Sequence, residues 1–193
     1  MAESDAKTRF GPLRCRALRK PPFEGPEPRF FRCPDCGSVF FGVKEGAEPA
    51  CCGEKLEELP RHSPEEFPDL RLSYEIFGSL NENAVRAVWE SDNWKEKPAW
   101  VYLRSFSGGQ LKYVAERKRS PLIFGLADED AYAYCDKDPC VECTFRCKRG
   151  FGLFFFFPER GLIYLPLDRM SARQQTKNHG VPLDEILRQE GRL

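Results

Sequence analysis

Two pairs of cysteines constrain the fold of this chain more than any other feature of its sequence. The pairs are Cys33 with Cys36, and Cys51 with Cys52. An insert long enough for one β-hairpin separates them, and each pair is followed by a glycine, Gly37 or Gly53. A glycine after a C-x2-C turn lets backbone N–H groups point at the sulfurs, and four thiolates suit a tetrahedral metal ion. Residues 30–59 are therefore predicted to form a small metal-binding domain.

The second cysteine pair departs from the ordinary zinc ribbon, whose second half usually spaces its ligands two residues apart. Neighbouring residues of an extended chain point their side chains to opposite faces. Cys51 and Cys52 can reach one ion only if the backbone twists locally, and the adjacent Gly53 eases that twist. So small a domain buries little apolar surface, so the metal is expected to supply much of its stability.

The composition of the chain favours metal binding over disulfide formation as the role of its cysteines. The chain has nine cysteines but two histidines. Its first residues lack the apolar core of a signal peptide, which leads us to expect a reducing, cytoplasmic setting. The longest apolar run, residues 151–157, is far below the ~18 residues of a membrane helix, so no membrane association is expected. Basic and acidic residues number 30 each, so nucleic acid is not expected as the main partner.

The rest of the chain divides by pattern. Residues 1–29 are rich in proline and arginine and are predicted to be an extended arm. Prolines interrupt residues 60–68, which are predicted to be a linker. Residues 69–168 have the pattern of strands separated by turn signals, without helical periodicity, and predict an antiparallel β-sandwich. The tail, residues 169–193, is predicted to end in a short helix that begins near Pro182.

The sandwich is predicted from alternating apolar and polar residues, as in residues 70–77, and from the hairpin signal Ser107–Gly109. The aromatic run at residues 153–157 is interpreted as a central strand that is buried on both faces. The predicted fold class is therefore mainly β, with a small metal module before the sandwich.

A second cysteine cluster lies inside the predicted sandwich, in the loop at residues 135–147. Its members are Cys135, Cys140, Cys143 and Cys147. The first three spacings resemble those of plant-type [2Fe–2S] ferredoxins, but the fourth cysteine follows much sooner than in those proteins. The cluster is predicted to hold zinc, iron or an iron–sulfur cluster, and two disulfides are the alternative for an exported protein.

The first site resembles the desulforedoxin-type iron module that also begins the desulfoferrodoxins. The resemblance is carried by CPDCG at residues 33–37 and CCGEKL at residues 51–56. It implies that Cys33, Cys36, Cys51 and Cys52 hold one iron in an FeS4 centre that passes single electrons, with zinc as the alternative metal. It further implies a rubredoxin-like fold for the module, followed by an immunoglobulin-like sandwich that keeps the scaffold of the superoxide reductases. A redox partner protein and a homodimer are also implied.

Histidine content separates this chain from the enzymes of that family, whose catalytic iron uses four histidines and one cysteine. His62 and His179 cannot supply that set, so superoxide reduction is not expected and no catalytic residue is assigned. Two other functions stay open: a zinc-stapled module that binds a protein or nucleic acid, and a metalloenzyme centred on residues 135–147. The basic runs at residues 117–119 and 146–149 are expected to be solvated, or to dock an acidic redox partner.

Overall fold

β-Strands are the main regular elements of the computed structural model, which describes residues 19–20, 27–43, 46, 48–77, 84–134 and 147–167. The strands of the two larger sheets are β6 (Arg61–His62), β7 (Leu70–Phe77), β8 (Ala84–Ser91), β9 (Trp100–Arg104), β10 (Gly109–Tyr113), β11 (Leu122–Gly125), β13 (Gly152–Phe157) and β14 (Gly161–Pro166). The remaining elements are β1 (Arg19–Lys20), β2 (Arg29–Arg32), β3 (Val39–Gly42), β4 (Ala50–Cys51), β5 (Glu54–Lys55), β12 (Ala133–Tyr134) and the 3-10 helices η1 (Pro64–Glu66) and η2 (Asp128–Ala131).

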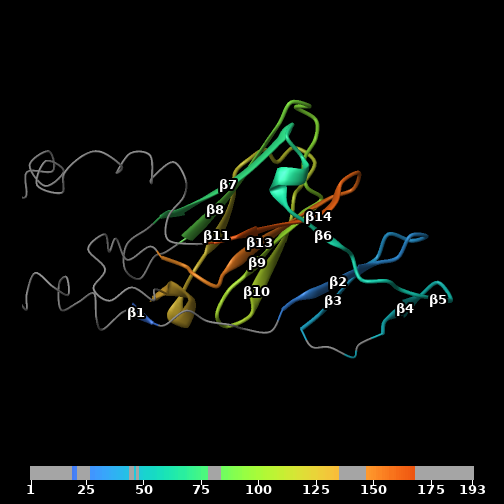
Figure 1. The fold of residues 1–193 in the computed structure, drawn as a ribbon, viewed down its shortest axis with the longest axis horizontal. Helices are drawn as coiled ribbons and strands as arrows, with labels where there is room; N and C mark the ends of the chain where they lie inside the picture. The colour runs from blue at the N-terminus through green and yellow to red at the C-terminus, as the bar shows by residue number, and fades with distance from the viewer. Residues whose placement is uncertain are drawn as a thin grey trace, which may run out of the picture.

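Two sheets pack face to face and form the body of the structure (Figure 1). The larger sheet has the order β10-β9-β13-β14-β6, and the smaller has the order β11-β8-β7. Neighbouring strands are antiparallel except for β14 and β6. One apolar cluster joins Ile76, Val85 and Ala87 of the smaller sheet to Val101 and Leu153 of the larger one. The prediction of a mainly β protein with an antiparallel sandwich is confirmed.

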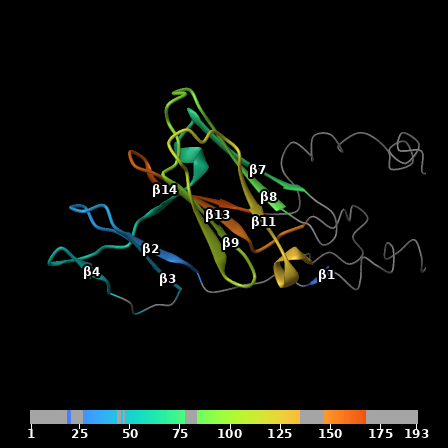
Figure 2. The same ribbon diagram turned by 180° about the vertical axis from the view of Figure 1, so that it is seen from behind.

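Strand β13 explains why the chain carries a run of four phenylalanines. Its residues alternate between faces, so Phe155 and Phe157 enter the core between the two sheets, while Phe154 and Phe156 point to the opposite face. On that face Phe30 of β2 covers them. The larger sheet therefore lies between the smaller sheet and the cysteine-bearing strands, and β13 is fully buried. This arrangement is visible from behind in Figure 2.

The proline-rich stretch that was expected to be a linker takes part in the fold. Strand β6 pairs with β14, and η1 follows it. Arg61 donates hydrogen bonds to Glu27 (2.7 Å) and to the carbonyl of Pro28 (2.7 Å). The amide of Leu59 donates to the carbonyl of Phe30 (2.7 Å). These contacts tie the cysteine-bearing segment to the edge of the larger sheet.

Several sequence expectations lie outside the described residues: most of the arm at residues 1–29, most of the loop at residues 135–147, and the tail with its short helix. Within the described part of the chain, no helix is long and apolar enough to span a membrane.

An arginine bridge fastens one end of the sandwich. Arg160, in the turn between β13 and β14, donates to both carboxylate oxygens of Asp69 (2.8 and 2.6 Å) and to those of Glu96 (2.5 and 3.0 Å). Asp69 precedes β7, and Glu96 lies in the loop between β8 and β9. Hydrogen bonds from Arg160 are the main cause that lowers the pKa of both carboxyls, from 3.8 for Asp69 and 4.5 for Glu96.

We expect an Arg160→Gln variant to lose stability less steeply in acid than the parent protein. A carboxyl with a lowered folded-state pKa stabilises the fold above its unfolded pKa, and this contribution disappears as the pH falls through the folded value. The parent should therefore have the larger free energy of unfolding above about pH 5, and this difference from the variant should disappear between about pH 5 and about pH 3. Urea unfolding midpoints measured across that range test this. The control is Arg71→Gln, which removes an exposed ion pair with Glu90 (3.7 Å). Parallel curves of urea midpoint against pH for Arg160→Gln and the parent would contradict the expectation.

Candidate metal centre

Two small antiparallel ladders present the four cysteines of the first cluster. In one ladder β2 pairs with β3, and in the other β4 pairs with β5. Cys33 directly follows β2, and Cys36 lies in the turn that leads to β3. Cys51 ends β4, and Cys52 lies in the turn to β5. The two turns therefore face each other across the site, and each contributes two sulfurs.

The backbone in the two turns has the conformation that was expected from the sequence. The amide of Gly37 donates to the carbonyl of Cys33 (3.0 Å), and the amide of Cys33 donates to the carbonyl of Ser38 (2.9 Å). Cys52 and Gly53 adopt φ values of 50° and 87°, both in the left-handed region. That region is unusual for a residue with a Cβ. The local twist expected for the adjacent cysteines is present, and it turns both sulfurs toward the first pair.

The sulfur separations fit a single tetrahedral ion. All four Sγ atoms lie within 4.8 Å of one another. Those of Cys36 and Cys51 are 3.5 Å apart, and those of Cys51 and Cys52 are 3.9 Å apart. A metal–sulfur bond of about 2.3 Å in a tetrahedral site places its sulfurs about 3.8 Å apart. The four predicted residues are thus brought together, and they could hold one metal ion.

The cluster has one buried side and one side open to solvent. Cys33 is fully buried, and it packs with Phe31 and Leu56 in a small apolar cluster of its own. Cys36 and Cys52 are exposed, and Cys51 is half-buried. An ion at this site would therefore be anchored from inside and reachable from outside through two of its ligands.

The pKa values of the thiols differ within the cluster because the four sulfurs lie so close together. Hydrogen bonds with the side chain and backbone of Ser38 lower the pKa of the Cys36 thiol from 9.0 to about 6. A hydrogen bond with Cys36 raises the pKa of Cys51 to about 12, and contacts with Cys36 also raise the pKa of Cys52. One thiolate at Cys36 thus opposes ionisation of its neighbours, and a bound metal ion would relieve that repulsion.

Ser38 is a site residue that the sequence reasoning missed. Its hydroxyl oxygen lies 3.1 Å from the sulfur of Cys36. In the sequence it lies two positions after Cys36, beside the C-x2-C turn. A hydrogen bond to a thiolate ligand tunes the metal that the ligand holds.

Of the second cysteine cluster, the described residues include Cys147 alone, while Cys135, Cys140 and Cys143 lie outside them. Cys147 is buried. Its carbonyl accepts a hydrogen bond from the amide of Tyr134 (2.8 Å). The two ends of the loop therefore lie side by side, which is compatible with gathering four thiols but leaves the second site a prediction.

A buried polar network fixes the base of that loop. Asp130 accepts hydrogen bonds from the hydroxyls of Ser105 (2.8 Å) and Ser107 (2.7 Å) and from the amide of Ser107 (2.9 Å). Lys148 is fully buried and donates to the carbonyls of Asp130 (2.9 Å) and Tyr132. Burial lowers the pKa of Lys148 to about 8. The segments on either side of the loop are thus joined by hydrogen bonds.

The histidines are not placed as metal ligands in the described part of the chain. Nδ1 of His62 lies 2.9 Å from Glu66, and its imidazole contacts the ring of Phe67. His179 lies outside the described residues. His62 therefore has a structural setting at the start of η1, away from the four sulfurs.

Comparison with known proteins adds little to these observations. No protein-family model and no curated protein matches the chain. Among solved structures, the superoxide reductase from Treponema pallidum is similar, with 18% sequence identity and a TM-score of 0.47, over 73% of this chain and 99% of that chain. A likeness at this level identifies neither a family nor an activity.

Proposed function

We propose that the Cys33, Cys36, Cys51 and Cys52 cluster binds one iron ion and that the protein transfers single electrons through it. The observation that carries this proposal is the combination of four sulfurs at tetrahedral spacing with two of them, on Cys36 and Cys52, exposed. Iron held by four thiolates supplies a one-electron ferric/ferrous couple. The four sulfurs leave no open coordination position, which favours electron relay over substrate chemistry.

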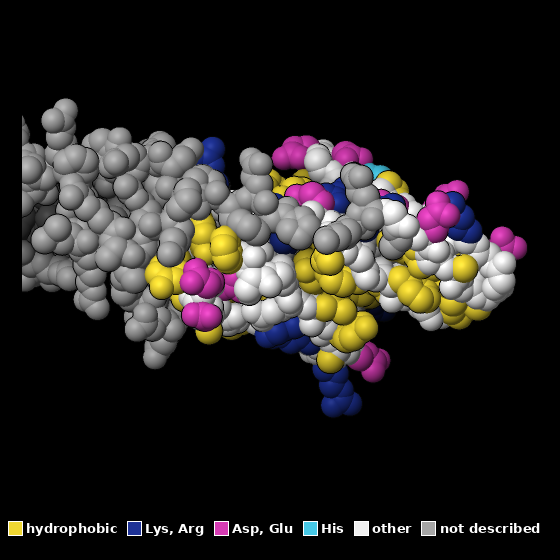
Figure 3. All heavy atoms as spheres, turned by 90° about the horizontal axis from the view of Figure 1, so that it is seen from below, with side chains coloured by type: hydrophobic (Ala, Val, Ile, Leu, Met, Phe, Trp, Pro, Cys, Tyr) yellow, Lys and Arg dark blue, Asp and Glu magenta, His cyan; other side chains and the backbone are white. Residues whose placement is uncertain are grey.

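Each ligand has its own role in this proposal. Cys33 anchors the centre to the apolar side of the module, where Phe31 and Leu56 exclude water. Cys36 and Cys52 face solvent, so a partner protein can approach their sulfurs directly. Ser38 stabilises the thiolate of Cys36 and thereby its charge as a ligand. Hydrophobic side chains gather in patches on the face shown in Figure 3, and Phe41 and Val43 of the module are exposed.

The proposal also includes a partner, a cellular setting and a role for the second cysteine cluster. The partner is a redox protein in the cytoplasm, and the cluster at residues 135–147 is a second thiolate centre that exchanges electrons with the first. A structural zinc ion is the second candidate for the first site, because the same sulfur spacing suits zinc equally well. In that case the module would serve to bind a protein or nucleic acid.

Metal analysis and visible spectroscopy of the full chain, purified without oxygen, test the proposal. We expect iron at the first site, visible absorption from ferric thiolate, and bleaching by one electron equivalent per ion. Cys52→Ser should change the spectrum and the reduction potential, whereas Cys15→Ser, at a cysteine with no assigned ligand role, should change neither. A Cys140→Ser/Cys143→Ser double variant isolates the contribution of the second cluster. Colourless protein that contains zinc and no iron would overturn the proposal.

A further inference from the structure

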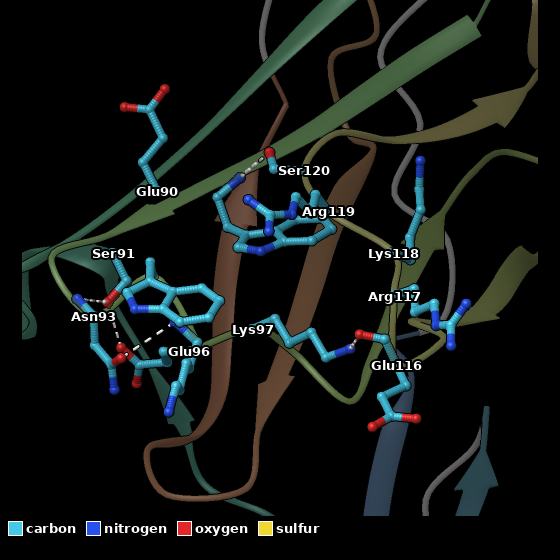
Figure 4. A pocket seen from close by; sticks show the side chains of 13 residues that line it. Glu90, Ser91, Asn93, Glu96, Lys97, Glu116, Arg117, Lys118, Arg119 and Ser120 are labelled. Carbon is cyan, nitrogen blue, oxygen red and sulfur yellow. Dashed lines mark hydrogen bonds between the residues drawn. The ribbon is translucent and has the colours of Figure 1, made fainter.

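A groove opens between two loops at one end of the sandwich (Figure 4). One loop joins β8 to β9, and the other joins β10 to β11. The groove has a volume of about 730 Å³. The first loop lies at the top of Figure 1, whereas β4 and β5 of the cysteine module lie at its right edge. The groove is therefore separate from the candidate metal centre.

The groove is preformed by hydrogen bonds between and within its loops. The amide of Trp89 donates to the hydroxyl of Ser120 (3.1 Å). The ammonium of Lys97 donates to the carbonyls of Ala115 (2.7 Å) and Glu116 across the groove. Within the first loop, Ser91 donates to Glu96 (2.5 Å). A ligand would thus meet walls that are already in place.

An exposed tryptophan stands in this groove. Trp94 is 74% exposed, more than any other large hydrophobic side chain in the described part of the chain. The ammonium of Lys95 lies 5.4 Å from its ring centroid, and the guanidinium of Arg119 lies 5.9 Å from it. An indole so exposed adds nothing to the core, and the two cations beside it form an aromatic and positively charged platform.

Positive charge in the groove is largely unmatched. Among the described residues, no carboxylate pairs with Lys95, Arg117, Lys118 or Arg119. The acidic side chains of the groove do not offset this, because Glu96 is engaged by Arg160 and Glu90 lies near Arg71. Glu116 remains, and in Figure 4 its carboxylate points away from the side chains of Arg119 and Ser120. The charged ends of Arg117 and Lys118 also point away from the loop that carries Asn93 and Glu96, so Arg119 is the basic side chain of its loop that lies toward the groove in this view. Five basic and three acidic side chains line the groove, so its lining carries a net positive charge beside the exposed ring of Trp94.

We propose that this groove binds single-stranded nucleic acid, with a base stacked on Trp94 and the neighbouring phosphates held by Arg117, Lys118 and Arg119. A basic groove that follows the backbone, combined with an aromatic side chain that stacks a base, is the general design of such sites. A free nucleotide fits less well, because small-ligand pockets enclose most of their ligand and this groove leaves Trp94 exposed. The inference is independent of the metal and goes beyond the proposed redox function. The equal numbers of basic and acidic residues in the whole chain gave no sign of this site, because its positive charge is confined to the groove.

Fluorescence anisotropy with a labelled twelve-residue oligothymidylate tests the proposal on the full chain at low salt. We expect Trp94→Ala to weaken binding about 5- to 150-fold and Trp94→Phe to restore most of it. Replacing Arg117, Lys118 and Arg119 by glutamine should reduce the slope of log affinity against log salt by about 2. Tyr113→Ala is the matched control, since Tyr113 is 73% exposed on β10 outside the groove, and it should bind like the parent.

Unchanged affinity of Trp94→Ala for the oligothymidylate would overturn the proposal, and so would equally tight binding of a duplex of the same length. Displacement of the oligothymidylate by thymidine monophosphate or by a polyglutamate peptide, at matched charge concentration, would also overturn it. The metal content and visible spectrum of Trp94→Ala should equal those of the parent. Failure of this site is thus distinguishable from failure of the redox proposal.

Discussion

A Cys33→Ser variant is expected to lose the metal of the first site and to unfold the segment that carries it. Cys33 is the ligand on the buried side, and its sulfur packs with Phe31 and Leu56. The ladders of this segment are only two to four residues long, so they cannot hold the turns together without a crosslink. Metal binding in comparably small modules contributes about 10–16 kcal/mol of apparent free energy, and this is largely folding free energy.

Metal content per chain and amide hydrogen exchange measure the outcome. The variant should lose protection in β2 to β5, while β7, β8 and β13 keep theirs. Cys15→Ser serves as the control and should retain full metal content and protection. Retention of the metal by Cys33→Ser, with unchanged exchange in the module, would show that the four cysteines do not form one site.

The gathering of Cys33, Cys36, Cys51 and Cys52 into one candidate site could be predicted from the sequence because its determinants are local. The C-x2-C turn and the adjacent pair with Gly53 limit how the backbone can run, and the structure has the left-handed conformations that these residues required. Strand positions were also predictable where the pattern alternates, as in β7, whose bounds match the prediction. The contribution of Ser38 to the pKa of Cys36 was missed, although Ser38 lies beside the C-x2-C turn.

Contacts between distant segments could not be predicted, because no local pattern encodes them. Residues 60–68 have the prolines of a linker, yet two residues of this stretch complete the edge of the larger sheet beside β14. The groove around Trp94 requires residues 89–97 and 116–120 to meet, and these loops are joined through side-chain hydrogen bonds that the sequence does not reveal. The aromatic run was correctly assigned to a buried strand, but what covers its outer face was not foreseen.

Phe30 is the buried side chain at the centre of that cover, and a Phe30→Ala variant is expected to destabilise the protein by about 3–5 kcal/mol. Phe30 is 1% exposed. Its ring lies 5.1 Å from that of Trp100, 5.3 Å from that of Tyr102 and 5.4 Å from that of Phe154, measured between ring centroids. Removing the ring leaves a cavity on the outer face of the larger sheet and weakens the contact between the module and the sandwich.

The register partner of Phe30 on β3, Phe41, provides a matched control. It is 49% exposed, so Phe41→Ala should cost only about 1 kcal/mol. Urea unfolding followed by tryptophan fluorescence gives both free energies, and the metal content of both variants should stay unchanged, because neither side chain is a ligand. The ring of Phe41 also lies 5.1 Å from that of Tyr102, so equal losses in the two variants would mean that Phe30 contributes no more to the contact than its half-exposed neighbour does. A large loss in Phe30→Ala with the metal retained would show that the module covers the sheet as a preformed unit, because its internal crosslink survives the loss of that contact.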